Sequence, residues 1–298
     1  MKLTILVPAN FNFWRTVYSH GWSALKPFSI DRSEHALHRT LELYNGRISS
    51  IIISQKSIES LLVVSGQSVN PEERKDIIRQ VRSCFRIEED YTEFYREARK
   101  HRKFRWITRA GAGRLLRAPT VFEDMIKMIC TTNCSWSLTE VMINNLCQKL
   151  GIRSGDNQYT FPTPSAISSC SEKFIRKEIR AGYRAPYILE LSRDVADGKL
   201  DTEKWRSSDL PTADLYKEIH SVKGVGPYAA ANILKLIGRY DYLGIDSWCR
   251  KTFFELYKNG RKVNDKVIER FYEPFGKWKG LFFWLDLTKH WHGKKDPF

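Results

Sequence analysis

The feature that most constrains the fold of this chain is a short turn with two glycines, KGVGPY (residues 223–228), between two stretches of helical pattern. Gly224 and Gly226 allow the backbone to turn sharply and to approach a bound anion closely. Pro227 suits the first turn of the second helix, whose N–H groups and dipole favour an anion. The pattern therefore predicts two helices joined by a phosphate-binding hairpin, although a plain helix–turn–helix connection would use the same residues.

The composition describes a folded, basic protein of 298 residues, with 49 Lys and Arg against 34 Asp and Glu and a net charge of +15. A hydrophobic content of 42% argues against intrinsic disorder. The longest apolar run, residues 281–285, is far shorter than the ~20 residues that a membrane span needs. Residues 3–9 make a poor signal-peptide core, so we expect a cytoplasmic (nucleoid-associated) or nuclear protein without membrane contact.

The six cysteines are scattered along the chain, which favours reduced thiols over a disulfide framework. Cys130 and Cys134 could share one side of a helix, and Cys147 is the only further candidate ligand nearby. Because these do not complete a tetrahedral set, we expect no side-chain metal site and no iron–sulfur cluster.

Residues 1 to about 66 read as a small antiparallel sheet, and the rest reads as helices. Alternating apolar residues in 35–43, an Asn45–Gly46 turn and the β-branched segment 48–53 predict a hairpin, with a further strand at 60–64. Helical patterns follow at residues 122–129, 137–150, 186–196, 215–219, 228–237, 247–257, 267–271 and 281–291. The predicted class is α+β, mainly α, with an N-terminal sheet-plus-helix domain (1–110) and a helical domain (111–298).

The segment VKGVGPYAAANILKLIGRYDYLGIDSWCRK resembles the hairpin and catalytic-aspartate segment of the helix–hairpin–helix (HhH-GPD) DNA glycosylase superfamily. ICTTNCSWSL, YTFPTPSAI, AGYRAPYI and FGKWKGLFFWLDLTK are similar, in order, to segments of its 8-oxoguanine glycosylase branch. The resemblance covers about residues 115–292. The N-terminal part is similar to the auxiliary domain of that branch and of the 3-methyladenine (alkylbase) glycosylase II enzymes.

The resemblance implies a catalytic role for Asp246, whose carboxylate would stabilise the positive charge that develops on the sugar. An Asp before a helical pattern is also a common N-cap, and the two roles are compatible. Lyases of this branch carry a nucleophilic lysine two positions after the second hairpin glycine, where this chain has Tyr228. The implied enzyme is therefore monofunctional and uses water. Lys223 is expected to contact phosphate, with a displaced nucleophile as the alternative.

The resemblance also implies how DNA would be held. Backbone groups of the hairpin would bind a phosphate, through Val222, Lys223, Gly224, Val225, Gly226 and Tyr228. Carbonyls of His220, Val222 and Val225 would hold a Na⁺ or K⁺ ion, and the His220 side chain is expected to be a helix-end residue.

For the flipped nucleotide, Asn133 would contact the orphaned base, Tyr183 would wedge the stack, and Arg184 would hold phosphate. The alternatives are a turn residue, a packed aromatic ring and a solvated charge.

The base pocket is the least determined part of the site. Aromatic rings able to stack on a flipped, electron-poor base are Phe11, Phe13, Trp14, Trp136 and Tyr228, although a chain this rich in aromatics places many of them in its core. Asn232 and Lys289 stand where the 8-oxoguanine enzymes have cysteine and glutamine, which weakens an 8-oxoguanine assignment.

Together these features predict a monofunctional DNA glycosylase that flips out a damaged, alkylated purine and hydrolyses its N-glycosidic bond to start base excision repair. We expect a monomer that acts on double-stranded DNA containing a damaged base and requires no cofactor. The alternatives are an oxidised-base (8-oxoguanine-type) glycosylase and a non-catalytic helix–hairpin–helix DNA-binding protein, in which Asp246 would only cap a helix. The charge of +15 suits all three, because phosphate neutralisation supplies most non-specific DNA affinity.

Overall fold

The computed structural model describes residues 1–155 and 157–293, which divide into two compact units. Unit 1 combines Met1–Glu89 with Arg114–Glu203, and unit 2 combines Asp90–Gly113 with the described residues from Lys204 onward. These units differ from the single boundary near residue 110 that the sequence suggested. Residues 114–203 group with the sheet, whereas residues 90–113 group with the C-terminal helices.

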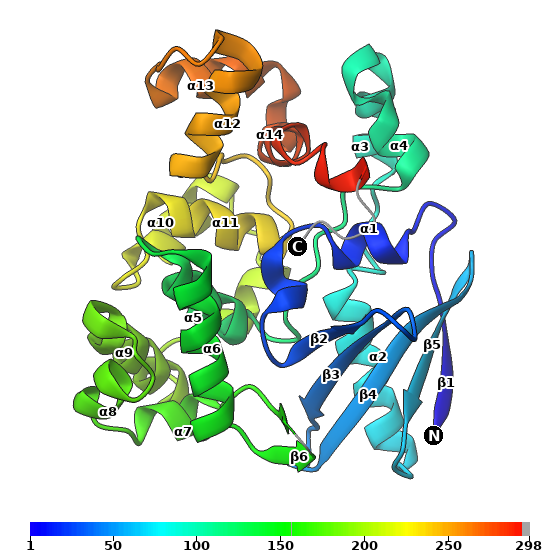
Figure 1. The fold of residues 1–298 in the computed structure, drawn as a ribbon, viewed down its shortest axis with the longest axis vertical. Helices are drawn as coiled ribbons and strands as arrows, with labels where there is room; N and C mark the ends of the chain where they lie inside the picture. Colours follow the sequence, from blue (N-terminus) through cyan, green and yellow to red (C-terminus); the bar gives the residue numbers. More distant parts are fainter. Residues whose placement is uncertain (156, 294–298) are drawn as a thin grey trace. The chain divides into compact units, whose positions relative to one another are not determined.

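The strands of unit 1 form a five-stranded antiparallel sheet in the order β1-β5-β4-β3-β2 (Figure 1). Their bounds are β1 (Lys2–Leu6), β2 (Phe28–Asp31), β3 (Ala36–Glu42), β4 (Ile48–Ser57) and β5 (Ser60–Ser65). Val63 pairs with Leu3 on one side and Ile53 on the other, and Ile53 also pairs with Leu37. All four side chains are buried, so this register gives the sheet one apolar face.

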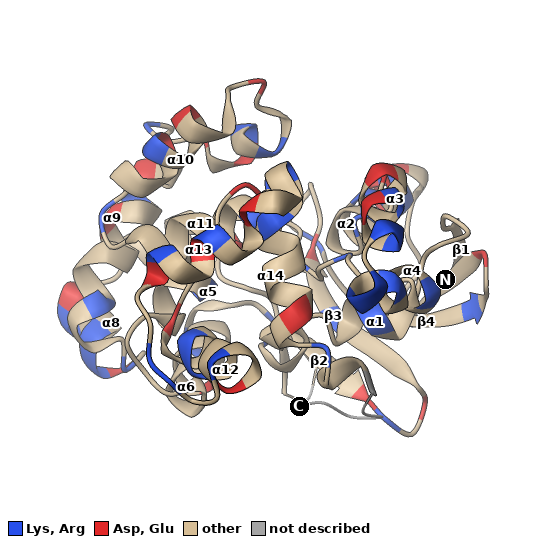
Figure 2. Ribbon diagram, turned by 90° about the horizontal axis from the view of Figure 1, so that it is seen from above, with Lys and Arg blue, Asp and Glu red and all other residues tan. Residues whose placement is uncertain are grey.

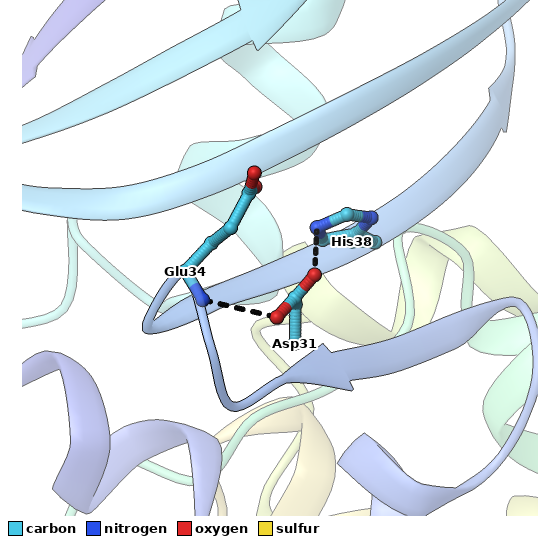
Figure 3. A group of neighbouring side chains, drawn as sticks. All are labelled: Asp31, Glu34 and His38. Carbon is cyan, nitrogen blue, oxygen red and sulfur yellow. Dashed lines mark hydrogen bonds and ion pairs between the residues drawn. The ribbon is translucent and has the colours of Figure 1, made fainter.

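The turn between β2 and β3 brings together Asp31, Glu34 and His38 (Figure 3). Oδ1 of Asp31 accepts hydrogen bonds from the backbone N–H groups of Ser33 and Glu34, and Oδ2 lies 3.9 Å from Nε2 of His38. Hydrogen bonds to Ser33 and Glu34 lower the pKa of the Asp31 carboxyl. These contacts close the hairpin.

Several helices of unit 1 start at a polar side chain that caps the helix. Asn70 and Glu73 form a reciprocal capping box before α2, and Thr120 caps α5. Figure 1 shows α2 against the sheet, where Gln80 donates a hydrogen bond to the carbonyl of Glu42. The helices are α1 (Phe13–Val17), α2 (Pro71–Cys84), α5 (Val121–Thr131), α6 (Trp136–Leu150), α7 (Pro164–Ser168), α8 (Glu172–Lys177) and α9 (Ala185–Ala196). A two-stranded ribbon, β6 (Arg153–Gly155) with β7 (Gln158–Tyr159), and short 3-10 helices complete the unit.

A buried group of charges ties the sheet of unit 1 to α5. Glu123 accepts from Arg39 of β3 at 2.6 Å and lies 2.7 Å from Nζ of Lys127, and all three side chains are almost fully buried. Burial acts to raise the pKa of the Glu123 carboxyl, but the two cations together lower it. This group explains why the segment after residue 114 belongs with the sheet.

Unit 2 is helical and is built around aromatic side chains. The ring of Phe94 lies 5.0 Å from that of Phe282 and 5.2 Å from that of Trp278, which links residues 90–113 to the C-terminal helices. Buried Asp286 accepts hydrogen bonds from the hydroxyls of Tyr257 and Tyr272. The helices are α3 (Thr92–Lys100), α4 (Arg105–Ala110), α10 (Thr212–Ser221), α11 (Pro227–Ile237), α12 (Ser247–Lys258), α13 (Asp265–Tyr272) and α14 (Lys279–Leu287).

The predicted fold class, a small antiparallel sheet with a helical bundle, is confirmed. Lys and Arg are spread over the helices of both units and are interspersed with Asp and Glu (Figure 2). Within the described residues, every helix is too short or too polar to cross a membrane.

Candidate active site

The glycine turn of unit 2 forms the predicted hairpin between α10 and α11. The N–H of Val225 donates to the carbonyl of Val222 at 3.0 Å, and Gly224 adopts a φ of 83°, a left-handed conformation that favours glycine. Gly226 is exposed at the N-cap of α11, and no side chain of a described residue caps that helix. The dipole of α11 therefore favours an anion at this exposed end of the helix.

Asp246 lies at the N-cap of α12, where its Oδ1 accepts a hydrogen bond from the backbone N–H of Cys249 at 2.7 Å. The side chain is half-buried, so the N–H donor orients the carboxylate while the residue remains accessible. The helix dipole favours negative charge at this position. The cap role is thus present, and the hydrogen bond from Cys249 fixes the orientation of the carboxylate.

The segment before Asp246 is held against α11 by Asn232. The Asn232 amide donates to the carbonyl of Tyr228 at 2.9 Å and accepts from Nζ of Lys235 at 3.0 Å. A Cβ on the buried Gly244 would lie only 2.3 Å from Nδ2 of Asn232, so that position requires glycine. This contact places the Gly244–Asp246 backbone beside the face of α11 that carries Asn232.

Sequence reasoning missed Lys235, whose side chain is buried with only 3% exposed. Its Nζ lies 5.0 Å from the ring centroid of Trp284 on α14. The available signal was a lysine within the otherwise apolar stretch AAANILKLI. Trp284 itself belongs to a cluster with Trp248 and Trp291, with centroids 5.3 to 6.1 Å apart, which the sequence did not single out either.

In unit 1, the structure brings Asn133 and Tyr183 together. Asn133 is exposed between α5 and α6 with a φ of 46°, so it is also the turn residue that the alternative interpretation proposed. Its Nδ2 lies 3.5 Å from the Tyr183 hydroxyl, which donates to the carbonyl of Thr132 at 3.3 Å. Tyr183 is 47% exposed, so its ring is presented outward rather than packed in a core.

Arg184 has a different position from the one predicted. Its side chain is 3% exposed, and its guanidinium donates to the carbonyl of Thr132 and lies 4.5 Å from the ring centroid of Tyr183. A buried guanidinium engaged in this way supports the turn at Asn133 from inside the protein. The expected phosphate contact of Arg184 is therefore corrected to an internal contact.

Several predicted pocket residues serve other contacts. Phe11 and Phe13 are buried against Phe85 in the core of unit 1, with centroids 6.0 and 5.4 Å away. Trp14 stacks on Tyr18 at 5.2 Å, so these N-terminal rings serve the packing of unit 1.

Two of the four remaining members of that predicted set are exposed. Trp136 is 40% exposed and covers Gly21, and Lys289 is exposed beyond the end of α14. By contrast, Tyr228 and Asn232 are neighbours on α11, beside the Asp246 segment.

At the hairpin, Lys223 and His220 are exposed, and the His220 ring stacks on Tyr216 with centroids 5.7 Å apart. The carbonyl of Val222, one of the three expected to hold a monovalent cation, accepts the turn hydrogen bond described above.

The cysteines are free thiols. Burial raises the pKa of Cys130 and of Cys147 to about 12, so both thiols stay protonated at neutral pH.

Comparisons with known proteins agree with this architecture. The family model described as "HhH-GPD superfamily base excision DNA repair protein" matches residues 126–280. The "Probable N-glycosylase/DNA lyase" of Methanothermobacter thermautotrophicus is 26% identical over 221 residues, which cover 66% of this chain and 69% of that protein.

Two solved structures share the fold over nearly the whole chain. The 3-methyladenine DNA-glycosylase of Archaeoglobus fulgidus superposes with a TM-score of 0.76 at 20% identity, covering 97% of this chain and 98% of the other. The apo form of Clostridium acetobutylicum 8-oxoguanine glycosylase/lyase gives 0.74 at 23% identity, covering 96% and 95%. The sheet-containing part of this chain therefore also has counterparts in known structures.

Proposed function

Because this chain belongs to the HhH-GPD superfamily of base excision DNA repair proteins and is a DNA glycosylase, we propose that it is monofunctional and releases a damaged purine by hydrolysis. The observation that carries the proposal is the pairing of two features in unit 2. A carboxylate, Asp246, is oriented at the start of α12, and Tyr228 stands where lyases of the resembling branch carry their amine. Without that amine, the expected nucleophile is water.

The chemistry follows from the position of the carboxylate. Water attacks C1′ of the deoxyribose as the C1′–N bond breaks, and the base departs with the bonding electron pair. Asp246 stabilises the positive charge that develops on the sugar and accepts the proton of the attacking water. The N–H of Cys249 and the dipole of α12 hold the carboxylate in place for this role.

The remaining contacts of the proposal bind and distort the duplex. The hairpin at Gly224–Gly226 binds a backbone phosphate, with a Na⁺ or K⁺ ion on the carbonyls of His220, Val222 and Val225. Tyr183 enters the base stack while Asn133 contacts the base left unpaired by flipping. Their mutual contact and outward exposure support this role. The protein acts as a monomer.

The damaged base is an alkylated or otherwise modified purine in this proposal. An oxidised purine is the second candidate, since one of the solved structures with the same fold is that of an 8-oxoguanine glycosylase/lyase. A protein that only binds DNA is the third, and the half-buried, oriented Asp246 speaks against it because binding needs only the hairpin and basic surface.

The proposal is tested with duplexes that each carry one lesion, incubated with the wild type, Asp246→Asn and the control Asp214→Asn. Asp214 lies in the first turn of α10 and pairs with Lys217 at the surface, so its substitution should leave the reaction unchanged. We expect Asp246→Asn to lose at least ~100-fold in single-turnover base release while its duplex affinity stays within about twofold. Base release by Asp246→Asn at the wild-type rate would overturn the assignment.

A further inference from the structure

The mechanism proposed above makes no use of Lys235, a buried lysine on α11 of unit 2. Lys235 sits between the buried residues Leu234 and Leu236 on α11, and its side chain is 3% exposed. Burial of an ammonium lowers the stability of the folded protein, because the charge loses its hydration. A buried lysine at this position therefore suggests a functional role.

Contacts with Asn232 and Trp284 help to hold the ammonium in place. Nζ donates to Oδ1 of Asn232 at 3.0 Å, and the Trp284 ring centroid lies 5.0 Å away. The other end of the Asn232 amide is fixed by its hydrogen bond to the carbonyl of Tyr228. The cation is therefore directed along α11 toward Asn232 rather than outward to solvent.

The helical spacing places Lys235 on the face of α11 that borders the site. Tyr228, Asn232 and Lys235 are separated by four and three residues, which puts them on one face of the helix. A lysine side chain on a helix points back toward the N-terminus, here toward Asn232. The residues surrounding this face are half-buried rather than fully enclosed, namely Tyr228, Asn232, Asp246, Trp248, Trp284 and Trp291.

The charge of Lys235 depends on a small number of neighbours. Burial lowers the pKa of Lys235 to about 8, and Cys249 and Asp246, both from α12, act in the opposite direction. Burial raises the pKa of the Cys249 thiol, so Cys249 is neutral, and Asp246 is the carboxylate whose charge acts on Lys235. The neighbour from α14, Trp284, carries no charge. At neutral pH Lys235 is mostly protonated, and it loses its proton a little above pH 8.

We propose that Lys235 is a specificity-determining residue of this glycosylase: its ammonium disfavours damaged purines that carry a positive charge and favours uncharged ones that present a hydrogen-bond acceptor. The inference rests on the proposed function and narrows its substrate class. Among alkylated purines it selects uncharged adducts over ring-N-methylated cations, and it admits oxidised or deaminated purines.

Two physical effects of the Lys235 ammonium favour uncharged purines over cationic ones. A cationic base held beside Asn232 and Trp284 would lie within several ångströms of the ammonium, and at an effective dielectric near 20 the repulsion lowers its occupancy by roughly tenfold or more. An uncharged purine departs with the electron pair of the broken C1′–N bond and becomes negatively charged. The Lys235 ammonium stabilises that charge by a hydrogen bond, without giving up its proton.

The test compares single-turnover base release from matched duplexes. One duplex carries the cationic 7-methylguanine, and the others carry uncharged ethenoadenine, hypoxanthine or 8-oxoguanine. The variants are Lys235→Met, which removes the charge, and Lys235→Arg, which keeps it at all pH values used. Lys251→Met serves as the control, because Lys251 is exposed on α12. Thermal unfolding of each variant verifies that it is folded.

At pH 7 we expect the wild type to release the best uncharged base at least ~10-fold faster than 7-methylguanine, after subtraction of spontaneous loss. Lys235→Met should shift this ratio at least ~10-fold toward 7-methylguanine, whereas Lys235→Arg and Lys251→Met should not. As the pH rises from 7 to 9, Lys235 loses its charge, so the wild-type ratio of ethenoadenine to 7-methylguanine release should also shift toward 7-methylguanine. The same ratio for Lys235→Arg should stay constant. A ratio that Lys235→Met leaves unchanged, or a wild type that prefers 7-methylguanine, would overturn the inference.

A second measurement separates this inference from the proposed function. Binding of the same duplexes is measured by fluorescence anisotropy in the Asp246→Asn background, with and without Lys235→Met. Loss of the ammonium in Lys235→Met should raise the affinity for the cationic lesion relative to the affinity for the uncharged lesions. Base release that persists in Asp246→Asn would contradict the proposed function, whereas an affinity ratio independent of Lys235 would contradict the role of Lys235.

Discussion

The turn at Asn133 in unit 1 and the segment at Asp246 in unit 2 are built on the same plan with a different outcome. Each presents a polar residue on a loop that is supported by a buried cation. At Asn133 the cation is Arg184, which donates to the backbone carbonyl of Thr132. At Asp246 the cation is Lys235, which donates to the side chain of Asn232 and lies close enough to Asp246 for the two charges to interact.

The difference shows that a buried cation can either fix the conformation of a loop or act by its charge on the groups at a site. Arg184 binds a main-chain oxygen, so its effect is to fix the conformation of the loop that holds Asn133 and Tyr183. Lys235 binds a side chain on the helix face that borders the site, so its charge acts on whatever lies there. We therefore expect changes at Arg184 to alter stability and geometry, and changes at Lys235 to alter selectivity.

The largest expected effect comes from Gly244→Ala, which should displace the segment that carries Asp246. A Cβ at this buried position would lie 2.3 Å from Nδ2 of Asn232, so either Asn232 or the Asp246 backbone must move. A displacement of about 1 Å at a catalytic group lowers rates by on the order of 100-fold, and we expect a loss of that size in single-turnover base release.

The matched control for that substitution is Gly66→Ala, because a Cβ at Gly66 meets nothing within 4 Å. Wild-type rates for Gly244→Ala would mean that Asn232 does not position the Asp246 segment.

Arg184→Met tests the other side of the comparison. Loss of a charged donor to the Thr132 carbonyl should lower the free energy of unfolding by about 1–3 kcal/mol, measured by urea denaturation. The dependence of duplex affinity on salt should stay unchanged, since Arg184 is buried and makes no phosphate contact in this account. The exposed Arg193 on α9 provides the control, as Arg193→Met. A salt slope reduced by about 0.9 for Arg184→Met would instead indicate a phosphate contact.

Tyr183→Ala should have a smaller effect that is confined to function. The ring is 47% exposed, so the free energy of unfolding should change by no more than ~0.5 kcal/mol. We expect base release to fall by about tenfold, which corresponds to ~1.4 kcal/mol of lost support for the flipped state. Fluorescence of 2-aminopurine placed beside the lesion reports flipping directly, and an unchanged signal would reject Tyr183 as the wedge.

The smallest expected effect is a dependence of stability on pH that originates at Lys235. Its pKa is about 8 in the folded protein and near the ordinary lysine value of 10.5 in the unfolded chain. Between these values the unfolded chain binds more protons, so the free energy of unfolding rises with pH. The wild type should gain up to about 1 kcal/mol relative to Lys235→Met between pH 8 and pH 9, measured by denaturation at several pH values. Parallel pH profiles for the two proteins would contradict burial of a charged amine.

Local sequence patterns were sufficient to predict most elements of secondary structure. Alternation and the Asn45–Gly46 turn predicted the β3–β4 hairpin, and caps and glycines predicted α6, α9, α11 and α12 within one or two residues. The last predicted helix extended to Trp291, whereas α14 ends at Leu287. The domain boundary depended on tertiary partners such as Arg39 with Glu123, which no local pattern reveals.

The missed parts of the site share one physical cause. An arginine or lysine is normally assigned to the surface, and the residues that bury Arg184 and Lys235 lie far away in sequence. Thr132 is 52 positions before Arg184, and Trp284 is on a different helix from Lys235. Asp246, Asn133 and Tyr183 were singled out through the resemblance of their segments to those of helix–hairpin–helix glycosylases, because each lies in a short contiguous motif.

We propose to test hydrolysis by water at Asp246, without an amine nucleophile, in one single-turnover reaction that is divided into three samples. One sample is treated with alkali, one is left untreated, and one contains borohydride from the start. For an enzyme that uses water, we expect strand breaks only after alkali and no covalent protein–DNA product with borohydride. Breaks without alkali, together with a borohydride-trapped complex, would show that a lysine attacks the sugar and would contradict it.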